Sequence, residues 1–104
     1  MNDASKPKRP SFVDKVGKLC YEGKDVAAYL YQIPGDEDQR QRMRTILDAI
    51  IGHLEKTKRR ELPGIARDLK EVLAGPPSIM AAEQLQDGFD RMVKLWQAAR
   101  SGLF

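Results

Sequence analysis

Hydrophobic residues recur every three or four positions between Asp38 and Arg60, which is the most regular helical pattern in the chain. Apolar residues at this spacing fall on one face of a helix, and the polar residues between them fall on the other. Such a helix is unstable in water unless other elements cover its apolar face. The pattern therefore predicts a long helix over 38–60, packed within a bundle through Met43, Leu47, Ile50, Ile51 and Leu54.

Similar stripes predict two more long helices toward the C-terminus. The pattern restarts around Pro63, and proline is favoured in the first turn of a helix. This helix should end at Gly75, because two prolines follow and cannot continue it. Ser78 then has the side chain of an N-cap for the last helix, which should end at Ser101. The shared spacing predicts one core that includes Leu47, Ile50, Leu54, Leu69, Leu85 and Phe89.

The segment before the long helix is interrupted, and it predicts two short helices. Ser11 is a candidate N-cap for the first, and Gly23 is expected to end it. Asp25 would cap the second, which Pro34 and the following glycine terminate. Since no run of five or more residues alternates as a strand does, the fold class is all-α. We expect an antiparallel bundle of three long helices, with the two short N-terminal helices covering its open side.

The chain length of 104 residues is that of one domain, which we place at 11–104. Residues 1–10 are polar and basic, with Pro7 and Pro10 flanking Lys8 and Arg9, and are expected to form a disordered tail. The start of the chain lacks the apolar segment of a secretory signal, and no apolar run reaches the length of a membrane span. A single cysteine excludes an internal disulfide. These features predict a cytoplasmic protein with no membrane association.

Side chains for catalysis or metal binding are sparse. Zinc sites need clustered cysteine and histidine ligands, whereas this chain has one of each, Cys20 and His53. Cys20 lies on an apolar stripe and is expected to be a core thiol. Three acidic residues at 36–38 suit the positive end of a helix dipole better than a metal site. We expect no enzyme activity, no metal and no cofactor.

Basic residues are concentrated in the first 60 positions, although the net charge is only +3. The predicted long helix carries Arg40 and Arg44 one turn apart, and it ends in a dense run of basic residues. Cations at a helix C-terminus favour its dipole, so this run has a structural explanation. The same residues could instead bind phosphates, which leaves an accessory nucleic-acid-binding protein as an alternative. The candidate basic patch is Arg40, Arg44, Lys56, Lys58, Arg59 and Arg60.

His53 is the one candidate for covalent chemistry. It flanks the apolar face of the long helix, and Lys56 follows three residues later. The run His53-Leu54-Glu55-Lys56 resembles the H-x-x-K core of bacterial histidine-phosphotransfer domains, which are helical bundles of about this size. The resemblance implies that His53 accepts a phosphoryl group, that Lys56 neutralises it, and that the partners are a kinase and a receiver domain.

This chain departs from the family pattern around Lys56. Family members have an apolar residue before the lysine and a small residue after it, where this chain has Glu55 and Thr57. Thr57 is β-branched and follows His53 by four positions, which places it on the same face of a continuous helix. We therefore expect it to crowd a receiver domain, and we expect His53 not to be a phosphoacceptor.

Aromatic and apolar residues exceed what the helical stripes need. Tyrosine combines contact area with a polar tip, which suits an interface as well as the edge of a core. These residues either seal the short helices onto the bundle or form a surface for a partner or a second copy of the chain. The most economical interpretation is a small non-catalytic module that binds another protein as a regulatory or signalling adaptor. Its candidate partner-binding residues are Tyr21, Tyr29, Tyr31, Leu103 and Phe104.

Overall fold

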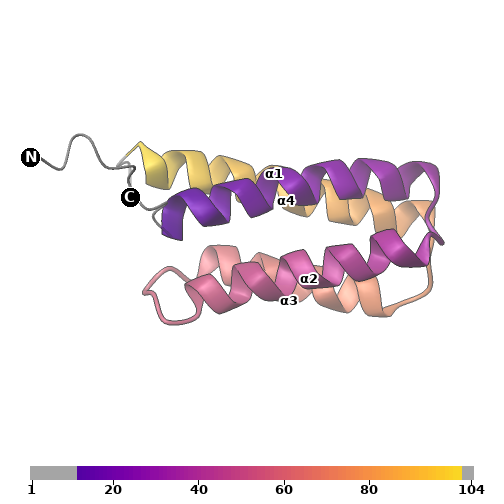
Figure 1. The fold of residues 1–104 in the computed structure, drawn as a ribbon, viewed down its shortest axis with the longest axis horizontal. Helices are drawn as coiled ribbons and strands as arrows, with labels where there is room; N and C mark the ends of the chain where they lie inside the picture. The colour runs from indigo at the N-terminus through magenta and orange to yellow at the C-terminus, as the bar shows by residue number, and fades with distance from the viewer. Residues whose placement is uncertain (1–11, 102–104) are drawn as a thin grey trace, which may run out of the picture.

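The computed structural model describes residues 12–101 and contains four helices within that range. They are α1 (Phe12–Gln32), α2 (Glu37–Leu54), α3 (Glu61–Ala74) and α4 (Ile79–Arg100). The helices run alternately up and down, and each packs against the two that flank it, α1 and α3 both contacting α2 and α4 (Figure 1). The α2–α3 loop therefore lies at the end of the bundle where α1 begins and α4 ends. The prediction of an all-α helical bundle is confirmed.

The apolar stripes of all four helices meet in one core, as their spacing predicted. Phe89, Leu47 and Ile50 are fully shielded from solvent, and Leu54, Leu69 and Leu85 belong to the same cluster. Cys20 is buried there as well, which agrees with its assignment as a core thiol. Burial raises the pKa of this thiol from 9.0 to about 12, because the charged thiolate would lose its solvation. Cys20 is therefore a packing residue and a poor nucleophile at neutral pH.

The prediction of two short N-terminal helices was wrong, because α1 continues without a break through Gly23 and Asp25. Gly23 is buried, and a Cβ atom at this position would overlap the ring of Phe89 on α4. A Cβ atom at Gly17 would in the same way overlap the indole of Trp96. Both glycines let aromatic rings of α4 lie against the α1 backbone. Gly23 thus serves helix–helix packing and does not end the helix.

The long helix predicted over 38–60 is shorter than expected, because α2 ends at Leu54. Thr57 explains the end: its backbone N–H and its hydroxyl both donate to the carbonyl oxygen of Leu54, at 3.0 and 2.7 Å. The hydroxyl also accepts from the N–H of Arg59 at 3.2 Å. Such side-chain bonds compete with the helical pattern for the backbone groups. The basic run at 56–60 therefore lies in the α2–α3 loop and not on a helix.

Several predicted helix ends are confirmed. Ser78 is the N-cap of α4, and its hydroxyl accepts from the N–H of Ala81 at 2.9 Å. Pro63 lies in the first turn of α3, which ends with Gly75 as its C-cap, and α4 ends with Ser101 as its C-cap. Predictions for the tail 1–10, the N-cap Ser11 and the apolar Leu103 and Phe104 fall outside the described residues.

Arg40 holds together the end of the bundle opposite the α2–α3 loop. The residue is only 5% exposed, and its Nη2 atom donates to the carbonyl oxygens of Leu73 and Gly75 at 2.6 and 3.1 Å. These carbonyls belong to the C-terminus of α3, whose last turn has no basic residue of its own. A cation is favoured at the negative end of a helix dipole. Arg40 of α2 supplies that cation to α3, so it is a structural residue.

Candidate binding site

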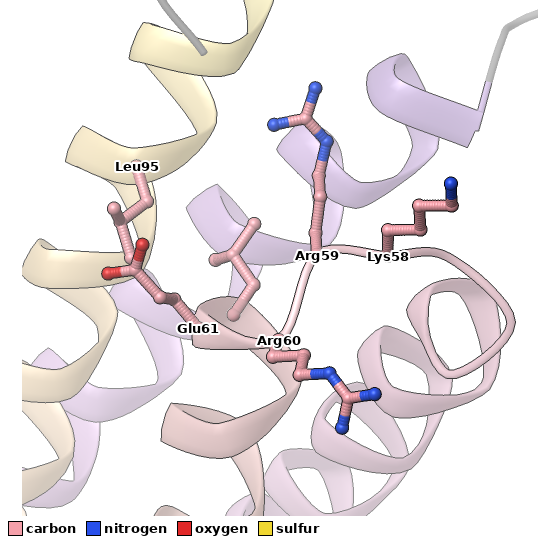
Figure 2. A pocket seen from close by; sticks show the side chains of 6 residues that line it. Lys58, Arg59, Arg60, Glu61 and Leu95 are labelled. Atoms are coloured by element: carbon pink, nitrogen blue, oxygen red, sulfur yellow. The ribbon is translucent and has the colours of Figure 1, made fainter.

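A hollow of about 380 Å³ opens where the α2–α3 loop meets α4, and we call it the loop pocket. Leu62 in the first turn of α3 and Leu95 of α4 supply its apolar surface, Leu62 being buried and Leu95 half-buried. The side chains of Leu95 and Glu61 are drawn on the same side of the hollow, beside α4 (Figure 2). The lining residues are Lys58, Arg59, Arg60, Glu61, Leu62 and Leu95.

Three successive cations border the loop pocket, and Figure 2 shows their charged groups pointing away from one another. Lys58 and Arg60 are exposed, and Arg59 is half-buried. The three side chains diverge around the apolar surface and do not meet over it. An adjoining hollow of about 160 Å³ shares Arg59 and Arg60 and adds Arg67 of α3. The result is an apolar depression with a positively charged rim.

The structure divides the predicted basic patch. Lys56, Lys58, Arg59 and Arg60 lie together in the α2–α3 loop, as their adjacency in sequence requires. Arg44 lies near the start of α2, where its Nη1 atom is 3.1 Å from the Gln41 side chain and 3.6 Å from Glu37. Arg40, in the same part of α2, is buried. The six residues therefore do not form one exposed surface.

His53 is exposed in the last turn of α2, and Lys56 is exposed in the turn that follows. His53 lines a shallow hollow of about 290 Å³ between α1 and α2 that also contains Lys15 and Lys18 of α1. The steric argument from Thr57 was wrong, because α2 ends before Thr57 and the two residues do not share a helix face. Sequence spacing could not reveal Lys15 and Lys18 as neighbours, since they approach His53 only through tertiary packing.

The predicted partner-binding tyrosines are exposed, and two of them are tied to the bundle. The Tyr21 ring meets Trp96 edge to face at 5.8 Å, and its hydroxyl accepts from Gln97 Nε2 at 3.0 Å. The Tyr29 hydroxyl donates to Asp36 at 3.1 Å, and this bond raises the pKa of Tyr29 because it opposes ionisation next to a carboxylate. These contacts match the alternative in which tyrosines seal a helix onto its neighbours.

Tyr31, a predicted partner-binding residue, belongs to a group of exposed apolar side chains at one end of the bundle. It lies at the C-terminal end of α1, and Ile33 follows it, while Ile79 and Met80 begin α4 at the same end of the bundle (Figure 1). Met80 is the most exposed of them at 71%. We call Tyr31, Ile33, Ile79 and Met80 the apolar tip. Its members lie at or next to helix ends, where neighbouring helices cover fewer positions of each helix face.

No group of three or more His, Cys, Asp or Glu side chains within 12–101 is arranged to hold a metal ion. None of the helices over the same range is long and apolar enough to cross a membrane. Comparisons with protein-family models, with curated proteins and with solved structures found no match to this chain.

Proposed function

We propose that this chain is a small non-catalytic helical module that binds another protein, as a regulatory or signalling adaptor. The observation that carries the proposal is the loop pocket, in which Leu62 and Leu95 are surrounded by polar side chains. Protein interfaces have this anatomy, with an apolar centre that supplies most of the affinity and a polar rim that remains partly hydrated. The exposed apolar side chains of the tip at the far end support the same function, because exposed apolar surface can mark an interaction site.

The test begins with a photo-crosslinking amino acid at Lys58 on the pocket rim, in the full chain expressed in its host. A matched protein carries the same group at Glu83, an exposed position in α4 away from the pocket. A polypeptide that crosslinks at position 58 and not at position 83 is then purified, and its affinity is measured by calorimetry. The proposal expects saturable binding that is lost in Leu95→Asp. Binding that is unchanged in Leu95→Asp would contradict the proposal, because the loop pocket is the observation that carries it.

Phosphotransfer through His53 is a second candidate, and one observation favours it. His53 is exposed in a hollow that Lys15 and Lys18 of α1 also line. These two cations could stabilise phosphoryl oxygens. The test is to incubate the protein with phosphorylated receiver domains and kinases of its host and to look for acid-labile, base-stable label. The adaptor proposal expects no label. Label that is lost in His53→Gln and retained in Cys20→Ser would make this a phosphorelay protein.

A further inference from the structure

We propose that the loop pocket binds an acidic amphipathic polypeptide segment, which inserts one apolar side chain against Leu62 and Leu95 and places its carboxylates near Lys58 and Arg60. This inference rests on the proposed function, because it names the chemistry of the partner at the same site. Its basis is the combination of a concave apolar surface with cations on successive rim positions.

The charges around the pocket favour an anionic partner. Within residues 12–101, neither Lys58 nor Arg60 makes an ion pair or a side-chain hydrogen bond, so both are available to carboxylates. Arg67 extends the positive rim through the adjoining hollow. On α4, Arg91 precedes Leu95 by one helical turn and is exposed. Among the described residues, Glu61 is the acid that lines the loop pocket, and Glu55 lines the adjoining hollow.

The size and lining of the pocket favour a side chain over a flat ligand surface. A volume of about 380 Å³ lies within the range of small-ligand sites and holds one large apolar side chain with its flanking backbone. Insertion would cover the exposed part of Leu95 and remove apolar surface from water, which is the main source of affinity in such contacts. The rim charges would chiefly raise the association rate and select acidic partners over basic ones.

The positions of the other cations argue against nucleic acid as the occupant. A phosphate backbone is bound by cations distributed along its path, and each phosphate contact adds to the affinity. Here Arg40 is buried at the opposite end of the bundle, and Arg44 lies on that same half of α2. Neither arginine therefore continues the loop cations along α2, and two leucines lie among those cations.

The inference is tested with phage-displayed random twelve-residue peptides selected on the full chain. Phage that also bind the Leu95→Asp variant are removed first. We expect the retained peptides to carry several Asp or Glu residues around one Leu, Phe or Trp. Retained peptides that are neutral or basic, or a selection that retains none, would overturn the inference.

Affinity of one retained peptide is then measured by fluorescence anisotropy against two charge-reversal variants. Lys58→Glu/Arg60→Glu alters the pocket rim, and Arg42→Glu/Arg44→Glu makes the same change in net charge on α2. We expect the rim variant to weaken binding at least tenfold and the α2 variant to weaken it less than threefold, with a steep loss in salt. Equal weakening by both variants would mean non-specific attraction and would contradict the inference. All four positions are outside the hydrophobic core, so both variants should fold.

Two further probes address other anionic ligands. They are a single-stranded oligonucleotide and vesicles of phosphatidylglycerol, each titrated at physiological salt. Tighter binding of either probe than of the peptide, with the same sensitivity to Lys58→Glu/Arg60→Glu, would replace the peptide by that ligand. If a crosslinked partner binds through Leu95 but is insensitive to rim-charge reversal, the proposed function stands and this inference fails. If neither a partner nor a peptide binds, both fail.

Discussion

The ring of Phe89 on α4 lies against Gly23 of α1, in the space that a Cβ atom on residue 23 would occupy. The two residues are far apart in sequence, and their contact sets how closely α1 and α4 pack. A glycine within a helix costs about 1 kcal/mol relative to alanine. At this position the close contact with an aromatic ring of the core offsets that cost, because Phe89 is fully buried only when the α1 backbone can approach it.

The variant Gly23→Ala should therefore destabilise the protein. Forcing a methyl group into a filled core costs about 1–3 kcal/mol, and the better helix propensity of alanine recovers only part of it. Urea denaturation followed by circular dichroism would show a lower midpoint. Replacing the ring as well, in Gly23→Ala/Phe89→Leu, should show favourable coupling between the two changes. Strictly additive losses would mean that the ring and the methyl group do not compete for one space.

The opposite sign is expected at Gly52, which lies in the last turn of α2. Nothing lies within 4 Å of a Cβ atom built at this position, and the residue is exposed. Gly52→Ala should raise the free energy of unfolding by about 0.5–1 kcal/mol, because alanine loses less backbone entropy on folding. The same urea experiment measures this change in the free energy of unfolding. Gly23→Ala is the matched comparison, because it replaces another glycine within a helix. A destabilised Gly52→Ala would show that residue 52 is not in an open helical position.

Arg40 should contribute far more to stability than the neighbouring Arg44. Arg40→Ala removes both hydrogen bonds to the C-terminus of α3, and bonds from charged donors are worth about 1.5–3 kcal/mol. Arg44→Ala removes partly solvated contacts, for which about 0.5 kcal/mol or less is expected. Arg40→Lys should restore only part of the loss, because an ammonium group lacks the guanidinium geometry. Equal denaturation midpoints for the two alanine variants would contradict the structural role of Arg40.

The buried thiol of Cys20 should make stability depend on pH in the alkaline range. Its pKa in the folded protein is about 12, against 9.0 for an ordinary thiol, so the folded state holds a proton that the unfolded state has released. Because the folded state then binds more protons, the free energy of unfolding falls as pH rises. The contribution is intact below about pH 9 and is lost progressively toward about pH 12.

This dependence is measured by comparing the wild type with Cys20→Ala in urea from about pH 8 to about pH 10.5. Lysine and tyrosine side chains titrate in both proteins, so their effects cancel in the difference. The stability advantage of the wild type should shrink with increasing pH, by at most about 1.4 kcal/mol per pH unit. An advantage that stays constant over this range would mean that the thiol is not desolvated in the folded protein.

Local patterns in the sequence were sufficient for the helical nature of the fold, for the core and for several helix ends. The spacing of Leu47, Ile50 and Leu54 fixes which side of α2 is buried, because a helix places every third or fourth residue on one face. Ser78 caps α4 through its own hydroxyl, which bonds to the third residue after it. These features depend on groups that are neighbours along the chain, so the sequence alone determines them.

The tertiary structure decided the features that depend on contacts between distant segments. A glycine at position 23 is compatible both with a helix end and with close packing against an aromatic ring. Only the position of Phe89 in the fold distinguishes the two roles. From the sequence, Arg40 would be expected to be a surface cation. In the fold, the C-terminal carbonyls of α3 lie within hydrogen-bonding distance of its guanidinium group. The loop pocket joins residues 58–62 to Leu95 across the bundle, and no spacing rule connects them. Such contacts form only when the helices associate, which is why the periodicity of each helix could not predict them.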